Sequence, residues 1–209
     1  LDIFWLNSLD CAIKKAESLL DEKKNVTILS LDIKDYYHNI DFNLSELNDI
    51  LELKIKKYFE STVIQENKIK KFIENGIYLN NLLSNIHQIY YRKVKVFLSN
   101  DQVGNSKYPL PIGLISSGFL ANYYLKDFDK TILQEVNPAF YGRYVDDLMF
   151  VFSDLNQHIN EKLVSPTISF IEKLFVKKNI FSINSDEPLV NEILFNNRFI
   201  NNNKEDVLE

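Results

Sequence analysis

Cysteine, histidine and long apolar runs are scarce in this chain of 209 residues, and their scarcity excludes several classes of protein. The single cysteine, Cys11, cannot form an internal disulfide bond or a cysteine-based zinc site, and the three histidines are scattered along the sequence. No apolar run approaches the roughly 18 residues that span a bilayer. Asp2 and Asp10 interrupt the only candidate signal peptide. We therefore expect a soluble, cytoplasmic protein with no membrane partner.

An excess of basic residues is also missing. Lys and Arg total 24 against 29 Asp and Glu, a net charge of −5, whereas nucleic-acid-binding proteins usually carry a basic excess that neutralises phosphates. Local basic runs at 54–57, 68–71 and 92–95 remain, and each is also typical of a solvated helix face. The chain does have 45% hydrophobic and 13% aromatic residues, too many for a disordered tail. Composition alone leaves the function open.

Helical and strand patterns alternate loosely along the chain, which predicts an α+β fold. Helices are expected over residues 3–20, 44–58, 69–89 with a bend at Gly76, 116–134 and 159–176. Strands are expected at 26–33, at 140–152 as a pair around a tight acidic turn, and at 181–183 and 193–195. A loop rich in turn-forming residues is expected at 99–106. The chain starts with Leu1 and its first helical pattern begins at once, so we expect a fragment of a longer protein.

Three aspartates stand where apolar strands end. Asp146 and Asp147 lie between two apolar stretches, and Asp32 ends the strand expected at 26–33. Burial of a carboxylate is unfavourable unless it is paired, protonated or bound to a cation, so each aspartate could also be a solvated turn or strand-end residue. On neighbouring strands of one sheet the three would converge, and converging carboxylates suit Mg²⁺, which prefers oxygen ligands. Two such ions about 3.5–4 Å apart stabilise the attacking and leaving oxygens of a phosphoryl transfer.

Three segments resemble the motifs of reverse transcriptases, in the order and with the kind of spacing of that family. Residues 143–147, Arg-Tyr-Val-Asp-Asp, are similar to motif C. Residues 31–41, which begin Leu-Asp-Ile-Lys-Asp-Tyr-Tyr, are similar to motif A, and residues 111–125, which begin Pro-Ile-Gly, are similar to motif B. The resemblance covers roughly residues 10–195.

The resemblance implies a fold and an activity for the chain. The fold would be the palm of a right-hand polymerase over residues 1–209, an antiparallel sheet backed by helices. Part of the fingers would be present, with a helical insertion at about 42–108, and the thumb would be absent. The activity would be the transfer of deoxynucleotides from dNTPs to a primer hydroxyl on an RNA or DNA template, with Mg²⁺ as cofactor and Mn²⁺ able to replace it.

The same resemblance assigns roles to individual residues. Catalytic and metal-binding groups would be Asp32, Asp146, Asp147 and the backbone of Ile33. Nucleotide-binding groups would be Asp35, Tyr36, Tyr37, Ile112 and Gly113, and the vicinity of primer and template would hold Arg143, Tyr144 and Val145. The ring of Tyr37 would clash with a 2′-hydroxyl and so favour deoxynucleotides, although it is also typical of a core aromatic.

One departure from the family narrows the subtype. Ile112 stands where motif B usually carries Gln between Pro and Gly. In this the chain resembles the divergent bacterial reverse transcriptases of abortive-infection and defence systems more than intron or retron enzymes. Some of those enzymes synthesise DNA without a template, from a protein primer, and form homo-oligomers. An intron- or retron-type reverse transcriptase, an RNA-dependent RNA polymerase and a catalytically silent palm that binds nucleic acid or acts in assembly remain alternatives. A palm-type cyclase is disfavoured because its Gly-Gly-Asp/Glu-Glu-Phe string is missing.

Overall fold

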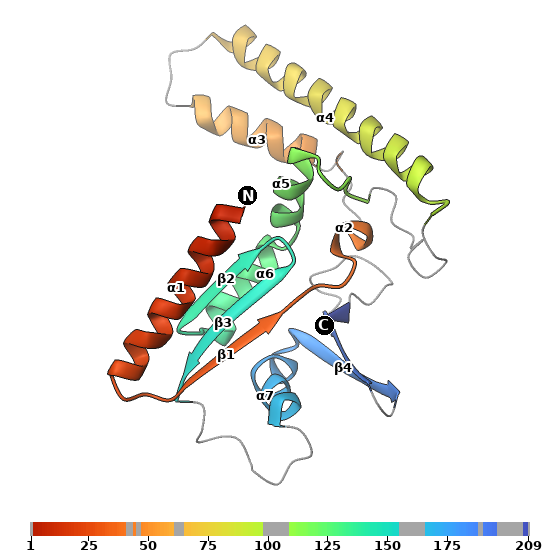
Figure 1. Cartoon of the computed structure of the whole chain (residues 1–209). Helices are drawn as coiled ribbons and strands as arrows, with labels where there is room; N and C mark the ends of the chain where they lie inside the picture. The colour runs from red at the N-terminus through yellow and green to blue at the C-terminus, as the bar shows by residue number, and fades with distance from the viewer. Residues whose placement is uncertain are drawn as a thin grey trace. The chain divides into compact units, whose positions relative to one another are not determined.

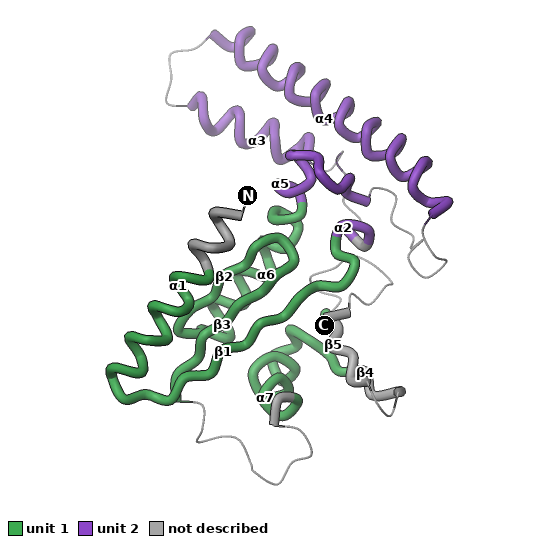
Figure 2. Tube along the Cα trace, in the orientation of Figure 1, with its two compact units in different colours: residues 1–36, 121–209 green, residues 37–120 purple. Residues whose placement is uncertain are grey.

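The computed structural model describes residues 2–40, 44, 47–60, 65–97, 109–154, 166–187, 190–195 and 207–208. Backbone contacts divide the chain into two compact units (Figure 2). Unit 1 is residues 1–36 and 121–209, and unit 2 is residues 37–120. The divisions fall within two short helices, α2 (Tyr36–Asn39) and α5 (Ile115–Tyr124). Unit 2 therefore contains the range 42–108, for which the sequence predicts a helical insertion.

Unit 1 has two antiparallel three-stranded sheets with helices beside them (Figure 1). Its helices are α1 (Asp2–Asp21), α6 (Lys126–Thr131), the π-helical η2 (Ile132–Val136), α7 (Pro166–Leu174) and the 3-10-helical η4 (Val176–Lys178). Its strands are β1 (Val26–Leu31), β2 (Phe140–Tyr144), β3 (Asp147–Ser153), β4 (Phe181–Glu187), β5 (Val190–Phe195) and β6 (Val207–Leu208). The strand orders are β1-β3-β2 and β4-β5-β6. The predicted α+β class is confirmed.

The central strand β3 is buried on both faces because successive side chains of a strand point to opposite sides of the sheet. On one side, Met149 and Val151 form a core with three residues of α1. These α1 residues are Ala12, Ala16 and Leu19. On the other side, Phe150 and Phe152 join a cluster of aromatic rings that links the two sheets and the helices between them. Its other members are Phe128, Phe170, Phe175, Phe181 and Phe195.

The register of the first sheet brings the end of β1 beside the β2–β3 turn. Leu31, the last residue of β1, pairs with Leu148, and Tyr144 pairs with Asp147 across the hairpin. One backbone hydrogen bond continues beyond β1, from the Ile33 N–H to the Asp146 carbonyl, with an N···O distance of 3.2 Å. The sheet therefore places Asp32 next to the turn, as the sequence predicts.

Unit 2 contains two helices that pack side by side, α3 (Leu47–Phe59) and α4 (Glu66–Val94). The bend expected at Gly76 is wrong, because α4 continues through this residue. Gly76 instead gives room for close packing, since a Cβ atom there would lie 2.5 Å from Cδ2 of Leu51 on α3. Nearby, the Asn80 side chain donates to the Leu44 carbonyl at 2.6 Å. Within the described ranges no helix, even α4 with its 29 residues, is long and apolar enough to cross a membrane.

Two other predicted elements need correction or lie partly outside the described residues. The helix expected over 116–134 is wrong as one element, because the chain forms α5, α6 and η2 in succession. The break is at Leu125, which has φ −89° and ψ 13° and is fully buried, so its packing overrides the helical pattern. Of the helix expected over 159–176, α7 and η4 are described, whereas 159–165 and the loop at 99–106 lie outside the described residues.

Candidate active site

The β2–β3 turn is a two-residue loop with an unfavourable backbone conformation. Its central residues are Val145 and Asp146, between the paired Tyr144 and Asp147. Val145 has φ +58°, in the left-handed region that a β-branched residue avoids. Conformations of this kind cost on the order of 1–3 kcal/mol and persist only where the surroundings impose them. In the two-residue turns that hairpins favour, the first central residue has a positive φ. With Asp146 at the second central position, Val145 occupies the first and takes the strained conformation.

Two hydrogen bonds hold the carbonyl groups of this turn. Nη1 of Arg143 donates to the Val145 carbonyl at 2.8 Å. The Ile33 N–H donates to the Asp146 carbonyl at 3.2 Å. The first bond fixes the strained residue from within the hairpin, and the second ties the turn to the segment that follows β1. The turn is therefore imposed by its own arginine and by the neighbouring strand.

Arg143 is itself fixed by a network of polar groups, most of them partly buried. Its side chain is 6% exposed and bonds to both carboxylate oxygens of Asp129 on α6, with Nε–Oδ1 at 2.8 Å and Nη2–Oδ2 at 2.6 Å. It also donates to the side chain and the carbonyl of Asn122 on α5, at 2.9 and 3.0 Å. The Tyr141 hydroxyl donates to Asp129 at 2.6 Å, and burial and then the Asp129 charge hold the pKa of Tyr141 well above its usual range.

This network bears on the role of Arg143 predicted from the sequence, in the vicinity of primer and template. The guanidinium directs its donors to Val145, Asp129 and Asn122 within unit 1. Sequence reasoning missed Asp129, although there was a signal for it. An arginine among strand residues that are otherwise apolar or aromatic needs a carboxylate partner when it is buried, and Asp129 on the preceding helix α6 is one of the acidic residues within reach along the sequence.

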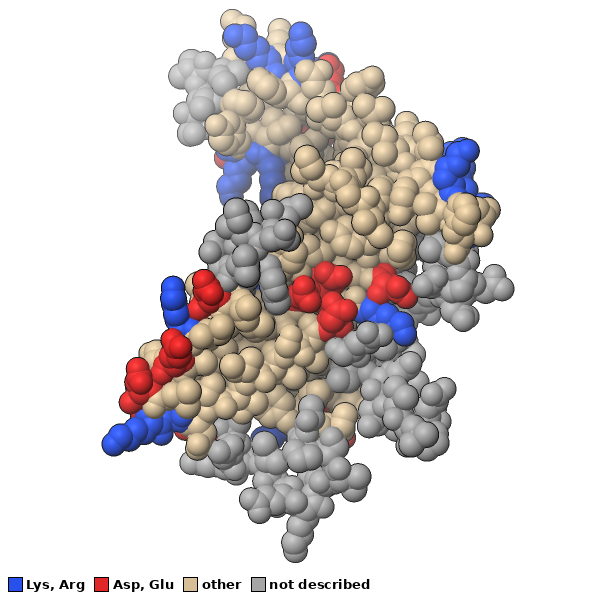
Figure 3. Space-filling view, viewed as in Figure 1, with Lys and Arg blue, Asp and Glu red and all other residues tan. Residues whose placement is uncertain are grey.

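The three predicted catalytic aspartates lie together at this edge of unit 1. Asp32 is exposed, and Asp146 and Asp147 are half-buried. Burial raises the pKa of Asp146, and the charges of Asp32 and Asp147 raise it further. Burial and then the charge of Asp32 raise the pKa of Asp147. In Figure 3 acidic side chains gather over the end of β1 and the β2–β3 turn. Like charges are therefore concentrated where the sequence predicts the metal site.

The carboxylate oxygens of this cluster are ligands that suit Mg²⁺, although the side chains are not arranged as a complete metal site. Among the residues that the structure describes, no group of three or more His, Cys, Asp or Glu side chains is arranged to hold a metal ion. The fit lies in the oxygen donors and in the mutual repulsion of the carboxylates, which a cation of this type would relieve. Asp32 and Asp146, with Asp147 beside them, are the groups that could hold it, and the backbone of Ile33 is adjacent.

The residues predicted to bind the nucleotide fall into both units. In unit 1, Asp35 has φ +50°, and Tyr36 is buried with its hydroxyl donating to the Ala121 carbonyl at 2.7 Å. In unit 2, the carbonyl of Tyr37 accepts from the Leu110 N–H at 2.8 Å, and its hydroxyl lies 3.9 Å from where a Cβ atom of Gly118 would be.

The other two nucleotide candidates belong to unit 2. Ile112 is 67% exposed, and Gly113 has φ +86°, a backbone conformation that favours glycine. The structure therefore groups the aspartates with Asp35 and Tyr36 in unit 1, and Tyr37 with Ile112 and Gly113 in unit 2.

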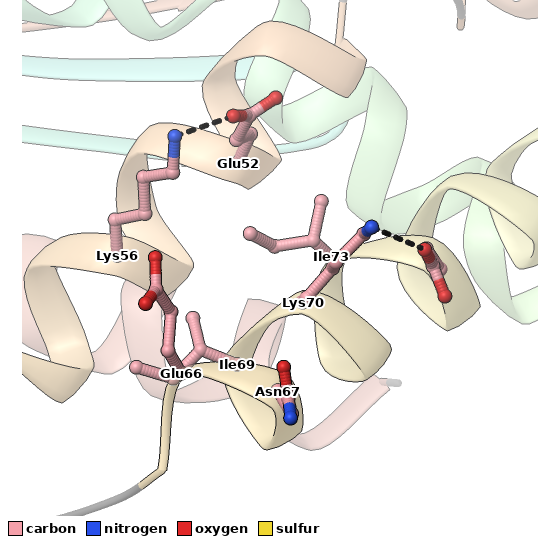
Figure 4. Close-up of a pocket in the computed structure, with 8 residues that line it drawn as sticks. Glu52, Lys56, Glu66, Asn67, Ile69, Lys70 and Ile73 are labelled. Carbon is pink, nitrogen blue, oxygen red and sulfur yellow. Dashed lines mark hydrogen bonds and ion pairs between the residues drawn. The ribbon is translucent and has the colours of Figure 1, made fainter.

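A pocket of about 580 Å³ lies elsewhere, between α3 and the first turns of α4 (Figure 4). Its two lysines are paired with glutamates, Lys56 at 2.6 Å from Glu52 and Lys70 at 4.0 Å from Glu74. The remaining lining residues are Glu66, Asn67, Ile69 and Ile73. Both lysines of this pocket are therefore neutralised by glutamates, and the pocket shares no residue with the predicted site.

Comparison with known proteins adds one finding. The model of the family described as reverse transcriptase (RNA-dependent DNA polymerase) matches residues 5–179. This range contains all three motifs and every site residue predicted from the sequence. Neither the curated proteins nor the solved structures include a match to the chain.

Proposed function

Because the chain belongs to the reverse transcriptase (RNA-dependent DNA polymerase) family, we propose that it extends a primer with deoxynucleotides at the aspartates of unit 1. Its α+β fold with an antiparallel sheet is that of the polymerase palm. The observation that carries the proposal is the hydrogen bond from Ile33 to Asp146, since it joins motif A to motif C and keeps Asp32 beside the turn.

The proposed division of work follows from the environment of each residue. Asp32 and Asp146 hold the divalent ions, with the Ile33 carbonyl beside them and Asp147 in less direct contact. Bound Mg²⁺ would supply charge neutralisation for the attacking hydroxyl and the leaving pyrophosphate. Arg143 keeps the turn in its strained form through the Val145 carbonyl, and Tyr144 and Val145 lie nearest to the primer end. Asp35, Tyr36 and Gly113 present backbone groups to the nucleotide.

The test is incorporation of labelled dNTPs by the chain with Mg²⁺ and a primed RNA template. Asp146→Asn should lower the rate at least about a thousandfold, because a ligand worth several kcal/mol to the transition state is lost. Asp127→Asn is the matched control, since Asp127 is an exposed aspartate of the same unit with 76% of its side chain accessible, and it should keep the rate. No incorporation in any reaction, with Mg²⁺ or Mn²⁺, would contradict the proposal and favour a catalytically silent palm.

Sugar selection is a finer part of the proposal, and it rests on Tyr37. The ring of Tyr37 excludes nucleotides with a 2′-hydroxyl, so Tyr37→Ala should raise the use of ribonucleotides relative to deoxynucleotides about tenfold or more. Tyr37→Phe keeps the ring and should keep the selection. Unchanged discrimination in Tyr37→Ala would remove this role, and a preference of the unchanged chain for ribonucleotides would favour an RNA polymerase.

The subtype is the finest part of the proposal: a defence-type enzyme that primes from protein and needs no template. The support is Ile112, an exposed apolar residue where the family usually has a glutamine. The same assay without template or nucleic-acid primer tests it. Labelled DNA that remains attached to protein after denaturation is the expected product. Synthesis that requires an added template and primer would instead place the chain with intron- or retron-type enzymes.

A further inference from the structure

The long helix α4 carries its charged side chains towards its two ends. Three lysines lie in its first turns, and Arg92 and Lys93 lie in its last turn. Residues 75–91 between them contain no Lys, Arg, Asp or Glu. Basic side chains are visible at both ends of α4 in Figure 3. The solvent side of a surface helix is normally charged or polar along its length, so the middle of α4 departs from this pattern.

A straight row of side chains runs along the side of α4 that faces solvent. Its members are three or four residues apart, which places them on one face of the helix. We name it the outer row, and its members are Lys71, Asn75, Tyr78, Leu82, Ile86, Ile89 and Lys93. All of them are exposed, and the four large apolar or aromatic side chains are between 43% and 68% exposed. Gly76, which meets Leu51 of α3, and the buried His87 lie on the other side of the helix.

Folding of unit 2 does not account for the outer row. Complete burial of one such side chain contributes about 1.5–3 kcal/mol, and none of the four is buried in the structure. Single exposed apolar residues are ordinary, whereas a contiguous row of them is typical of a surface for another molecule. Lys93 in the last turn is also stabilised by the helix dipole, but Lys71 near the opposite end is not. The helix alone therefore does not explain a lysine at each end of the row.

The two lysines indicate the kind of molecule that the row binds. Lys70 is paired with Glu74, whereas no ion pair joins Lys71 or Lys93 to another residue in the described ranges. A rise of about 1.5 Å per residue places Lys71 and Lys93 about 33 Å apart along α4. We propose that the outer row docks an amphipathic helix of another protein, whose apolar stripe of about three turns has Asp or Glu at each end.

Three other occupants fit the row less well. In a helix that lies on a membrane, basic residues flank the apolar face, whereas Lys71 and Lys93 are in line with it and would have to enter the lipid. Single-stranded nucleic acid stacks its bases on aromatic rings, and the row has only Tyr78. A second copy of α4 centred on the row would place lysine against lysine in either direction, which is unfavourable between like charges.

The first test measures the binding of two synthetic helical peptides to the chain by fluorescence anisotropy. Both peptides carry the same row of leucines over three turns, and they end in glutamates in one and in lysines in the other. The glutamate-ended peptide should bind at least about tenfold more tightly, and added salt should reduce the difference. Leu82→Gln combined with Ile86→Gln should weaken its binding at least about tenfold. The control is Leu53→Gln on α3, at a residue with 70% exposure outside the row, which should bind as the unchanged chain does.

The second test reverses the charge at the ends of the row. Lys71→Glu combined with Lys93→Glu should exchange the preference, so that the lysine-ended peptide binds more tightly. Lys54→Glu combined with Lys57→Glu makes the same change in net charge at two exposed lysines of α3. This control should keep the preference for the glutamate-ended peptide, because its substitutions lie outside the row.

The remaining probes are vesicles of anionic phospholipid, a single-stranded RNA oligonucleotide and the chain itself in sedimentation equilibrium. Each is compared between the unchanged chain and the Leu82→Gln, Ile86→Gln variant. Binding of vesicles, RNA or a second copy that this variant loses would overturn the inference. Equal binding of both peptides, or binding of neither, would overturn it as well. None of these measurements uses a dNTP or a metal ion, so their outcome is independent of the polymerase proposal.

Discussion

The β2–β3 turn of unit 1 and helix α4 of unit 2 depart from ordinary protein surfaces in opposite ways. The turn is held by a polar side chain that is almost buried, since the Arg143 side chain is only 6% exposed in its pair with Asp129. Helix α4 does the reverse and leaves large apolar side chains such as Leu79 in solvent, at 62% exposure. Buried ion pairs add little net stability, and exposed apolar rows add none until something covers them. Both features are therefore better explained by function than by folding.

The difference between the two regions lies in what completes them. The turn is complete within its own unit, since its carbonyls, its arginine and the partner of that arginine all satisfy one another. Helix α4 is different, because several of its large apolar side chains, among them Leu79, Leu82 and Ile89, stay largely exposed. The polar contacts of unit 1 thus fix the geometry of one turn, whereas α4 of unit 2 keeps apolar side chains in solvent.

The largest effect should come from breaking the polar network of unit 1. Arg143→Met leaves Asp129 without its cation and removes the bond to the Val145 carbonyl, so the free energy of unfolding should fall by about 2–4 kcal/mol. This is below the fully buried value, because 29% of the Asp129 side chain is accessible. Urea unfolding measures it.

The control for this prediction is the double variant Arg143→Met with Asp129→Leu. It removes both charges at once, so its loss of stability should be smaller than the sum of the two single losses. Simple additivity would mean that the pair does not act as a unit. Polymerase activity should remain low in the double variant even where stability recovers, because the Val145 carbonyl still lacks its donor.

An intermediate effect should come from His87, the buried polar residue on the inner face of α4. Neither ring nitrogen has a hydrogen-bond partner in the described part of the chain, and burial lowers the pKa of His87 below its ordinary 6.5. As pH falls below 6.5, His87 is protonated in the unfolded chain before it is protonated in the folded chain. The free energy of unfolding should therefore decline by up to about 1.4 kcal/mol per pH unit.

Replacement of His87 tests this sign directly. His87→Leu should be more stable than the unchanged chain at pH 7, because two unsatisfied buried nitrogens are gone, and it should lose the decline in stability between pH 7 and 5. His38→Leu, at a half-buried histidine, should keep the original decline. If the decline persists in His87→Leu, another titratable group causes the pH dependence of stability.

The smallest effect should come from the charge of Asp146 on stability. Its pKa is raised above the ordinary 3.8, so its ionised form is less stable in the folded chain than in the unfolded chain. Asp146→Asn should raise Tm by about 1–3 °C at pH 7, a modest gain because water screens this partly exposed cluster. The gain should fade as pH falls towards 3.8, and added Mg²⁺ should stabilise the unchanged chain more than the variant. Calorimetry across pH measures both.

Local patterns were enough to predict the sheet that carries the site. The run from Val26 to Leu31 and the hairpin around Asp146 are short, apolar and bounded by turn residues, so their state depends little on distant contacts. The convergence of Asp32 with the hairpin was also predictable, because an aspartate at the end of each neighbouring strand places the carboxylates at one edge. The metal ligands and nucleotide contacts stay predictions.

What could not be predicted depends on tertiary contacts. The break at Leu125 follows from burial of its side chain, and the close approach of Leu51 to Gly76 across two helices depends on how these helices pack. The left-handed Val145 contradicts its own conformational preference and is explained only by the hydrogen bonds around it. The partner of Arg143 also required the fold, since a helix brings Asp129 to it from outside the hairpin.

The pairing of β1 with β3 has a consequence for how the chain can vary. All of unit 2 lies in the sequence between these two strands. When β1 pairs with β3, unit 2 is therefore part of the chain segment whose ends the sheet brings together. The entropy of closing a loop grows slowly, by only about 0.6 kcal/mol for each doubling of its length. Insertions and deletions in unit 2 should thus hardly change the free energy of joining the strands. Unit 2 can therefore change in length while the sheet still brings Asp32 beside the β2–β3 turn.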